Sequence, residues 1–336
     1  MALLEVQELT TQFKTAHGRF NAVNAVSFTL ERGEMLGIVG ESGCGKSVTL
    51  RSIVQVLPRT ARITNGRVLY GGRNILRLSN RAMANVRGRE IAMILQDPMI
   101  ALNPVYTVGD QLMETLRETR GLRGPVARNR ALELLRLVHV PDPERRLSSY
   151  PHQLSGGLAQ RMVIAIALSA EPTILLADEP TTALDVTVQA QILNLLKELQ
   201  QELHMAMVLV THDLGVVAQS CSRVAIMYAG RIVEEGRTEQ IFEQPRHPYT
   251  VGLIASIPRV DGPLHQRLPS IPGAPPDLAR YQTGCSFAPR CPLASGECRE
   301  GVVSLVNVAP DHSVACLRHE LVNKQSIVFG VHNAAV

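Results

Sequence analysis

The sequence has no apolar run long enough to cross a lipid bilayer, which takes about 20 residues in a helix. The best candidate, Met162 to Ala170, is short and lies between Arg161 and Glu171, so it predicts a buried helix. The start of the chain also lacks the basic and apolar stretches of a secretory leader, since an acid stands at Glu5. We therefore expect a protein of the cytoplasm, where thiols are kept reduced and its six cysteines do not pair as disulfides.

The sequence also lacks a strong excess of charge of either sign. It has 34 Lys and Arg against 30 Asp and Glu, and a net charge of +4 is too small to indicate a nucleic-acid partner. The arginine-rich stretch from Arg117 to Arg130 is interpreted as a solvated helical face. The length of 336 residues and the hydrophobic content of 45% fit a folded, soluble chain of about two domains.

Apolar runs of strand length alternate with helical patterns over the first part of the chain. Between Val188 and Leu203 the apolar positions fall on one face of a helix. Strands that alternate with helices of this length indicate an α/β fold with a mostly parallel sheet. The runs that predict strands are Met35 to Val39, Ile91 to Leu95, Ile174 to Ala177 and Met207 to Val210.

Two changes of pattern indicate how the chain is divided. Between residues 103 and 165 the strand signals disappear, so we expect a helical subdomain inside a first domain of residues 1–240. The remainder, residues 241–336, is rich in proline and cysteine. Ten of the 20 prolines lie between Pro245 and Pro292, and four of the six cysteines lie between Cys285 and Cys316. This composition predicts a second, small and loop-rich domain.

The segment from Gly40 to Ser47 reads GESGCGKS and fits the phosphate-loop pattern G-x-x-x-x-G-K-[ST]. It follows a predicted strand and opens a predicted helix, as the pattern requires. Backbone N–H groups of such a loop attract phosphates, Lys46 reaches the β- and γ-phosphates, and the Ser47 hydroxyl ligates Mg²⁺. The residues expected to bind the nucleotide here are Gly40, Ser42, Gly43, Cys44, Gly45, Lys46, Ser47 and Val48.

The apolar run Ile174 to Ala177 ends in two adjacent carboxylates, Asp178 and Glu179. Asp178 suits the shell of a Mg²⁺ ion, and Glu179 suits orienting and polarising the attacking water. Phosphoryl transfer needs little covalent help, so positioning and charge neutralisation account for most of its rate. Paired acids at a strand end are common, so these two identify a function only together with the motifs around them.

Four further motifs accompany these two in the order typical of ABC ATPases. Leu154 to Arg161, LSGGLAQR, resembles the signature motif of that family and stands 17 residues before Asp178. Gln96 resembles the Q-loop glutamine, Thr182 to Asp185 resembles the D-loop, and His212 resembles the switch histidine. The chain is thus similar to a P-loop NTPase of the ABC class, with a helical subdomain and a cysteine-containing C-terminal domain.

The resemblance implies a head-to-tail dimer, in which each ATP lies between the phosphate loop of one subunit and the signature of the other. Ser155, Gly156 and Gly157 would open a helix and offer an anion site to the partner's ATP. Leu158 stands where many family members have Gln or Met, and we interpret it as a packing residue. The resemblance further implies catalytic roles for Glu179, His212 and Gln96, Mg²⁺ ligation by Ser47 and Gln96, and nucleotide binding by Asp178 and Asp185.

The adenine ring is expected to stack on an aromatic side chain near the N-terminus. Phe13 is the main candidate and Phe20 the weaker one, while the alternative is that Phe13 is a core residue.

Several segments resemble the peptide and nickel importers more narrowly. They are Gln96 to Pro104, Tyr150 to Gln153, Arg246 to Thr250 and the late cysteines. To about residue 320 the chain is similar to the D-type ATPase subunit of dipeptide and oligopeptide permeases. The resemblance implies a related F-type ATPase as a partner, two transmembrane permease subunits, an extracytoplasmic substrate-binding protein, and a peripheral location at the cytoplasmic face of the inner membrane. Met99, Ile100 and Leu102 are either a docking surface for the permease or part of the core.

Two alternatives to peptide import stay open at this point. A soluble ABC ATPase that acts on ribosomes or nucleic acid shares every nucleotide motif, but it lacks the Arg246 to Thr250 segment and the cysteine-bearing tail. An importer of the same type could instead carry nickel, glutathione or antimicrobial peptides.

The late cysteines follow the spacing C-x5-C-x6-C-x17-C, and four thiols so close in a cytosolic chain suggest a metal site more than a disulfide frame. The resemblance implies that Cys285, Cys291, Cys298 and Cys316 hold a [4Fe-4S] cluster. Zinc usually has a C-x2-4-C pair, absent here, although His312 or His319 could substitute, and free thiols are the third alternative. Cys221, before an apolar run, is expected in the core.

Overall fold

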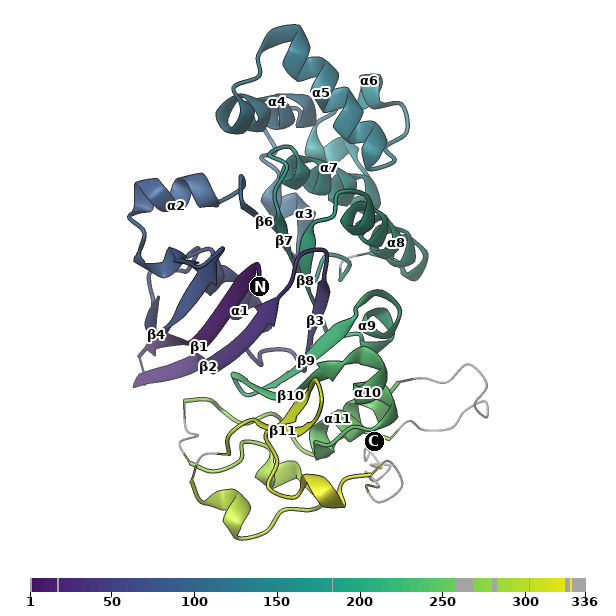
Figure 1. Ribbon diagram of the computed structural model, residues 1–336. Coiled ribbons are helices and arrows are strands. Elements are labelled where there is room, and N and C mark those ends of the chain that lie inside the picture. The colour runs from purple at the N-terminus through teal and green to yellow at the C-terminus, as the bar shows by residue number, and fades with distance from the viewer. Residues whose placement is uncertain are drawn as a thin grey trace. The chain divides into compact units, whose positions relative to one another are not determined.

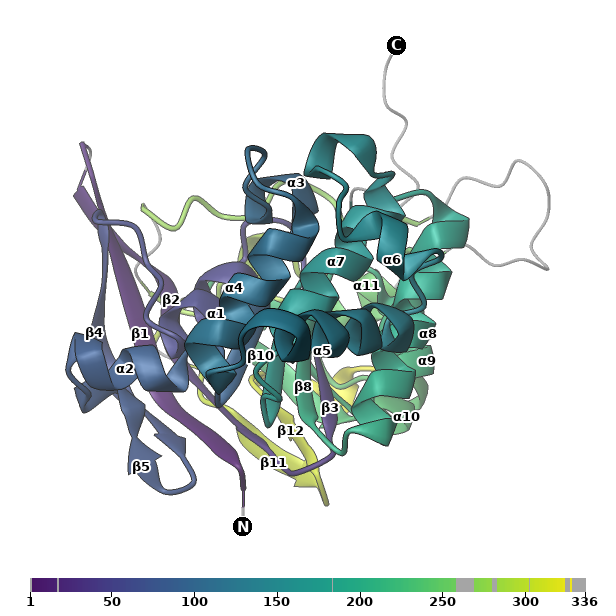
Figure 2. The same cartoon turned by 90° about the horizontal axis from the view of Figure 1, so that it is seen from above.

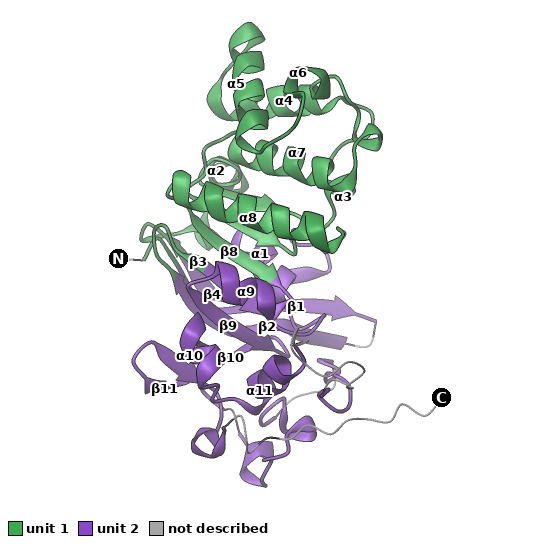
Figure 3. Ribbon diagram, turned by 90° about the vertical axis from the view of Figure 1, so that its right-hand side faces the viewer, with its two compact units in different colours: residues 1–4, 30–35, 69–210 green, residues 5–29, 36–68, 211–336 purple. Residues whose placement is uncertain are grey.

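The computed structural model describes residues 2–16, 18–182, 184–257, 269–279, 283–301, 303–323 and 327. The chain divides into two compact units, coloured separately in Figure 3. Unit 1 consists of residues 1–4, 30–35 and 69–210, and unit 2 consists of residues 5–29, 36–68 and 211–336. Among the residues described, no helix combines the length and apolar composition needed to cross a membrane.

Three short strands of unit 1 are parallel and largely buried. Strand β7 (Ile174–Asp178) lies between β6 (Ile91–Ile94) and β8 (Ala206–Thr211), with Ile174 level with Ile91 on one side and with Ala206 on the other. Every residue of β7 and β8 is buried, as expected for parallel strands covered on both faces. The strands predicted from the apolar runs at these three places are confirmed.

The longer helices of unit 1 lie around α7 (Gly156–Leu168). This helix contacts α4 (Val108–Arg120), α5 (Gly124–Leu137) and α8 (Val186–Glu202), and Figure 1 shows α4 to α7 grouped together. Thr107 caps the start of α4 by accepting the N–H of Asp110. The unit also contains α2 (Asn80–Val86), α3 (Pro98–Ala101), α6 (Pro143–Arg146) and the 3-10 turns η1 (Ile75–Arg77) and η2 (Pro151–Gln153).

Three expectations about these helices can be compared with the structure. The apolar face predicted from Val188 to Leu203 is buried in α8, but Leu203 itself follows the last helical residue and is exposed. Of the arginines from Arg117 to Arg130, the last is half-buried and the others are exposed, and they are divided between two helices and the turn that joins them. Of the residues with two alternative roles, Leu102 is buried, whereas Met99 and Ile100 are exposed.

Unit 2 contains a sheet in which the parallel pairing of the first strands gives way to antiparallel pairing. Strand β3 (Met35–Val39) pairs parallel with β9 (Arg223–Tyr228), which pairs antiparallel with β10 (Arg231–Arg237). The hairpin of β11 (Val306–Ala309) and β12 (His312–Val314) then joins β10 through β12. The sequence predicts β3, but it gives no sign that a hairpin from the cysteine-rich segment extends this sheet.

Three longer strands form a second sheet, and Figure 2 shows them side by side. Strand β1 (Leu4–Thr15) lies between β2 (Gly18–Leu30) and β4 (Ala61–Tyr70). The short strand β5 (Arg73–Asn74) pairs with β4 at the edge of this sheet. Gly66 has a φ of 107°, and a Cβ there would lie 2.7 Å from the Cα of Leu9. Only glycine permits β4 to approach β1 this closely.

The remaining elements of unit 2 are short. They are α1 (Lys46–Ile53), α9 (Leu214–Ser220), α10 (Thr238–Glu243), α11 (Pro248–Ala255) and the 3-10 turns η3 (Ala288–Arg290), η4 (Glu297–Arg299) and η5 (His319–Leu321). Tyr228, Tyr249 and Phe287 are the largest of the fully buried side chains, and their rings contact one another. Cys221 is buried, as predicted.

Candidate functional site

The phosphate loop connects the end of β3 to the start of α1, as the sequence predicts. A Cβ on Gly40 would lie 2.1 Å from the carbonyl oxygen of Met227, and one on Gly45 would lie 2.3 Å from that of Ala22. Gly45 also has a φ of 107° at the position before α1. Both glycines are therefore required by the close approach of backbone, and the loop leads directly into the helix N-terminus at Lys46.

Lys46 is only 4% exposed. Its ammonium donates hydrogen bonds to the carbonyl oxygens of Gly40, at 2.8 Å, and of Glu41, at 3.2 Å. These bonds place a buried positive charge inside the loop. Of the other residues expected to bind the nucleotide, Ser42 and Gly43 are exposed, and Ser47 and Val48 are half-buried.

Cys44 contributes no charge to the loop near neutral pH. Its side chain is buried, and burial raises the pKa of the thiol to about 11 in spite of the nearby Lys46. The side chain is therefore a small neutral group, and its backbone N–H is the part expected to serve the nucleotide.

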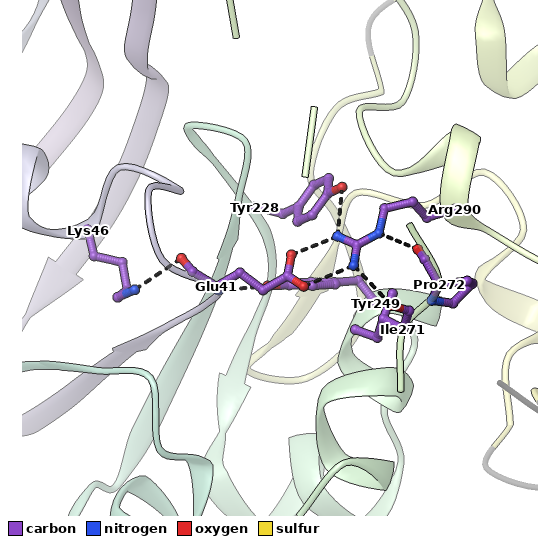
Figure 4. Close-up of polar contacts among 7 residues, drawn as sticks. All are labelled: Glu41, Lys46, Tyr228, Tyr249, Ile271, Pro272 and Arg290. Carbon is purple, nitrogen blue, oxygen red and sulfur yellow. Dashed lines mark hydrogen bonds and ion pairs between the residues drawn. The ribbon is translucent and has the colours of Figure 1, made fainter. Parts of the chain in front are cut away.

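Glu41 is held by residues far away in the sequence, as Figure 4 shows. The guanidinium of Arg290 donates to both carboxylate oxygens of Glu41, at 2.7 and 3.0 Å. The N–H of Glu41 donates to the hydroxyl of Tyr249 at 2.9 Å. Burial alone would lower the pKa of Arg290, but its bonds to Glu41 and Tyr228 raise the pKa further above its usual value, so the guanidinium is always charged.

In unit 1 the two adjacent carboxylates differ in their surroundings. Asp178 is the last residue of β7 and is fully buried, whereas Glu179 is half-buried and has a φ of 45°, which is rare for a residue with a side chain. Glu179 accepts hydrogen bonds from the side chains of Gln96, at 3.3 Å, and Thr182, at 2.8 Å. The structure thus brings together two of the three residues with predicted catalytic roles, Gln96 and Glu179.

The signature segment forms the start of α7. Ser155 is the N-cap residue, whose hydroxyl accepts the N–H of Leu158 at 3.4 Å, and Ser155 and Gly156 are exposed. A Cβ on Gly157 would lie 2.6 Å from a methyl carbon of Val188 in α8. Asp185 in turn caps α8 by accepting the N–H of Val188 at 3.0 Å. The signature therefore presents an open helix N-terminus, which is suited to an anion.

The remaining predicted nucleotide residues lie in unit 2. His212 is exposed in the turn between β8 and α9. Phe13 and Phe20 are half-buried and stack on each other, with ring centroids 5.8 Å apart and planes 15° from parallel. Since the rings are neighbours, the structure does not distinguish them as partners of adenine, and the assignment to Phe13 stays a prediction.

The four late cysteines line one small cavity of about 20 Å³. Cys298 is buried and the other three are half-buried, and burial raises the pKa of Cys285, of Cys291 to about 11 and of Cys316 to about 12. Among the described residues no three His, Cys, Asp or Glu side chains lie close enough together to hold a single metal ion. This cavity will be called the thiol cavity.

Neither histidine considered for zinc belongs to the thiol cavity. The Nε2 atom of His312 is instead hydrogen-bonded to the buried carboxylate of Glu234 at 2.8 Å. His247, which the sequence did not single out, does line the cavity. Burial lowers the pKa of His247 to about 3, and its Nδ1 accepts the N–H of Tyr249, so the proton of the neutral ring is on Nε2. That atom is buried without a hydrogen-bond partner in the part of the chain that the structure describes.

Sequence reasoning therefore missed His247, Tyr249 and Arg290. The only signal was their position within segments that were noted for other reasons, the Arg246 to Thr250 segment and the neighbourhood of Cys291.

Two family models match this chain. One, described as ABC transporter, matches residues 23–182. The other, described as oligopeptide/dipeptide transporter, C-terminal region, matches residues 233–298. The first match includes the phosphate loop, the signature and Glu179, and the second includes His247, Arg290 and three of the four late cysteines.

The chain is similar over almost its full length to proteins with assigned names. It is 51% identical over 323 residues to the probable peptide ABC transporter ATP-binding protein y4tR of Sinorhizobium fredii, with 96% of each chain covered. It is 51% identical over 315 residues to the dipeptide transport ATP-binding protein DppD of Bacillus subtilis, with 94% of each covered. Among solved structures, the dimeric ATP-binding cassette MJ0796 in a post-hydrolysis state with ADP and Pi is similar, with a TM-score of 0.63 and 30% identity over 70% of this chain and 98% of that one.

Proposed function

Because this chain belongs to the family of ATP-binding subunits of peptide ABC transporters, we propose that it binds and hydrolyses ATP to power the import of peptides through a partner permease. One observation carries the proposal. The phosphate loop, with the buried Lys46, contacts Tyr249 and Arg290 of the region that matches the oligopeptide/dipeptide transporter model. The nucleotide motif and the transporter-specific region are thus parts of one compact unit.

In the proposed reaction, water attacks the γ-phosphorus of ATP and the bond to the ADP oxygen breaks. Lys46 and the N–H groups from Gly43 to Val48 neutralise and orient the phosphates, and Ser47, Gln96 and Asp178 are the residues that would hold a Mg²⁺ ion, which would neutralise further phosphate charge. The Glu179 carboxylate orients and polarises the water, and His212 assists at the γ-phosphate. Ser155, Gly156 and Gly157 bind the ATP of a partner ATPase subunit, which completes each site only in the dimer.

The partners of the proposed importer are two transmembrane permease subunits and a substrate-binding protein outside the membrane. We further propose that the second ATPase subunit is a related, F-type chain, and that the assembly holds this subunit at the cytoplasmic face of the inner membrane. The exposed Met99 and Ile100, on a short helix after Gln96, are the surface proposed to meet the permease. Leu102, being buried, is removed from that surface.

Purification of the tagged, full-length chain from detergent-solubilised membranes tests this function. Permease subunits should co-purify with it, and membrane vesicles that contain the assembly should take up labelled dipeptides or oligopeptides when ATP is supplied. Recovery of ribosomes or DNA without permease subunits would favour the alternative of an ATPase outside transport. Uptake of nickel, glutathione or antimicrobial peptides in place of ordinary peptides would reassign the cargo alone.

We also propose that the thiol cavity holds a [4Fe-4S] cluster that supports the C-terminal segment. Four thiols that converge on one cavity suit the four-thiolate ligation of such a cluster. A single zinc ion fits less well, because no three His, Cys, Asp or Glu side chains of the described residues are placed to hold one metal ion. The buried Nε2–H of His247 and the guanidinium of Arg318 at the cavity would complement a negatively charged cluster.

Metal content and colour test the cluster. Protein prepared without oxygen should be brown and contain about four irons per chain, as [4Fe-4S] ligation requires. Cys298→Ser should bleach it, whereas Cys221→Ser, which changes a buried cysteine outside the cavity, should leave iron and colour unchanged. Colourless anaerobic protein with one zinc would overturn the cluster, and an iron content unaffected by Cys298→Ser would remove that residue from the site.

A further inference from the structure

We infer that Arg290 is a positioning residue for ATP binding: it holds the phosphate loop through Glu41 and makes the loop depend on the segment that carries the cysteines. The inference rests on the proposed role of the loop in ATP binding. Arg290 lies 249 positions after Glu41 and immediately before Cys291. Nothing in the loop pattern itself calls for such a partner.

Glu41 is fixed at three points, which are drawn in Figure 4. Its carboxylate accepts two hydrogen bonds from Arg290, its N–H donates to Tyr249, and its carbonyl oxygen accepts from Lys46 at 3.2 Å. Figure 4 shows Glu41 between Lys46, on its backbone side, and Arg290, at the end of its side chain. A displacement of Glu41 would therefore move a group to which the phosphate-binding lysine is bonded.

Arg290 is itself rigidly held. Its side chain is 6% exposed, and the guanidinium donates to the carbonyl oxygens of Pro272, at 2.8 Å, and Ile271, at 3.3 Å, and to the hydroxyl of Tyr228 at 3.3 Å. A two-pronged guanidinium–carboxylate pair defines direction as well as distance. A cation fixed in this way can hold the second residue of the loop in one conformation.

The Arg290–Glu41 ion pair contributes more to fixing the conformation of the phosphate loop than to the overall stability of the fold. The Arg290 side chain is 6% exposed and that of Glu41 is 26% exposed, so the pair is largely withdrawn from water. Removing charges from water is costly, and such a pair often stabilises a fold no better than apolar residues of similar size. A charged pair at this place is better explained by what it does to the loop. It also neutralises a carboxylate that would otherwise stand, uncompensated, in a loop that binds a polyanion.

The same short stretch of chain connects Arg290 to the thiol cavity. Arg290 ends the turn η3, in which its N–H donates to the carbonyl oxygen of Phe287 at 2.9 Å. Phe287, Ala288 and Cys291 all line the cavity. The ring of Phe287 also contacts those of Tyr228 and Tyr249, which bond to Arg290 and Glu41. The order of the cysteine segment is thus transmitted to the loop through a few buried contacts.

Binding of a fluorescent ATP analogue with Mg²⁺ to the full-length chain tests this inference. Arg290→Met should raise the Kd at least tenfold, and Arg290→Lys, which keeps the charge but loses the two-pronged geometry, should give a Kd between those of the wild type and Arg290→Met. In a Glu41→Gln background, Arg290→Met should change the Kd less than threefold, because its effect acts through that carboxylate. In the assembled transporter, Arg290→Met should raise KM for ATP while kcat stays within about twofold.

The matched control is Arg237→Met, which removes an arginine of the same unit whose pair with Asp311 is exposed. It should leave the Kd unchanged. Near-UV circular dichroism shows whether Arg290→Met folds. If it does not, the Kd of Glu41→Gln tests the inference by itself. Glu41→Gln should raise the Kd about fivefold, and an unchanged Kd would overturn the inference. Equal effects of Arg290→Met with and without Glu41→Gln would overturn it as well.

The outcomes also separate this inference from the proposed function. A wild-type chain that binds no ATP would refute both, since the loop would then have no nucleotide. A wild-type chain that binds ATP, with a folded Arg290→Met variant that binds it equally well, would refute the positioning role and leave the proposed ATPase function standing.

Discussion

Lys46 in unit 2 is 4% exposed and is bonded within a loop that Tyr249 and Arg290 hold from 208 and 249 positions away. Glu179 in unit 1 is half-buried, and its carboxylate accepts hydrogen bonds from Thr182 and from the exposed side chain of Gln96. The phosphate loop is therefore preorganised around a buried lysine, whereas Glu179, the carboxylate proposed to position the attacking water, is half-buried and lies beside an exposed amide. This difference suggests that the chain alone is ready to bind ATP but depends on assembly to hydrolyse it.

The largest expected effect tests the carboxylate side of this comparison. Glu179→Gln should lower ATP hydrolysis about 100- to 10,000-fold, the usual contribution of a group that helps to transfer a proton, while the Kd for ATP changes less than about threefold. Phosphate release and size-exclusion chromatography with ATP measure this, and the variant should accumulate as an ATP-bound dimer. Glu198→Gln, on the exposed side of α8, is the control. Normal turnover of Glu179→Gln would remove Glu179 from its role.

A substitution in the phosphate loop should have the opposite result, a loss of ATP binding. Lys46→Ala should weaken ATP binding about 100-fold, because a hydrogen bond to a charged group contributes about 1.5–3 kcal/mol and this residue is expected to make more than one to the phosphates. Equilibrium binding measures the loss, and Lys197→Ala on α8 should bind normally. Wild-type affinity in Lys46→Ala would contradict the phosphate-loop assignment.

The adenine end of the site is expected to be less important. Phe13→Ala should weaken ATP binding roughly tenfold, since stacking of a base on an aromatic ring contributes about 1–3 kcal/mol. Phe20→Ala is the matched variant, because the two rings are stacked neighbours with similar burial. A larger loss of affinity in Phe20→Ala than in Phe13→Ala would transfer the role to Phe20.

The last prediction concerns stability at alkaline pH and not ATP binding or hydrolysis. Burial raises the pKa of Cys44 from its usual 9.0 to about 11, so the neutral thiol stabilises the fold fully below pH 9 and this contribution is lost as the pH rises toward 11. Between neutral and alkaline pH, Cys44→Ala should therefore lose about 2–3 kcal/mol less free energy of unfolding than the wild type. This figure is the pKa shift converted at about 1.4 kcal/mol per pH unit.

Urea unfolding at pH 8 and at about pH 11 compares the two proteins, and their remaining cysteines cancel because both contain them. Identical losses of unfolding free energy between these pH values would show that Cys44 does not titrate in this range.

Much of the core could be predicted from the sequence, because the information is local. The buried strands β3, β6, β7 and β8 are apolar runs, and α8 has one apolar face, so their periodicity identifies them. The phosphate loop is equally local, since its glycines and Lys46 are neighbours in the chain. The long strands β1 and β2 were not predicted, because each mixes buried and exposed positions without strict alternation.

The contacts that define the phosphate loop could not be predicted in the same way. Glu41, Tyr249 and Arg290 meet only because the sheet of unit 2 brings β3, β9 and β10 together and the later segments fold back on them. No periodicity relates residues 249 positions apart. The late cysteines were identified by their spacing, but that pattern does not reveal that the adjacent arginine belongs to another site.

The backbone of Glu179, with its φ of 45°, has a consequence for attempts to make this protein more heat-resistant. A left-handed conformation costs a residue with a side chain about 1 kcal/mol, and glycine avoids this cost. A screen that selects only for higher Tm would therefore favour Glu179→Gly, and the same change would delete the carboxylate that we propose positions the attacking water. With that proposed role, we expect stability and activity to be opposed at this position, the strain being the cost of keeping a carboxylate where the strand ends.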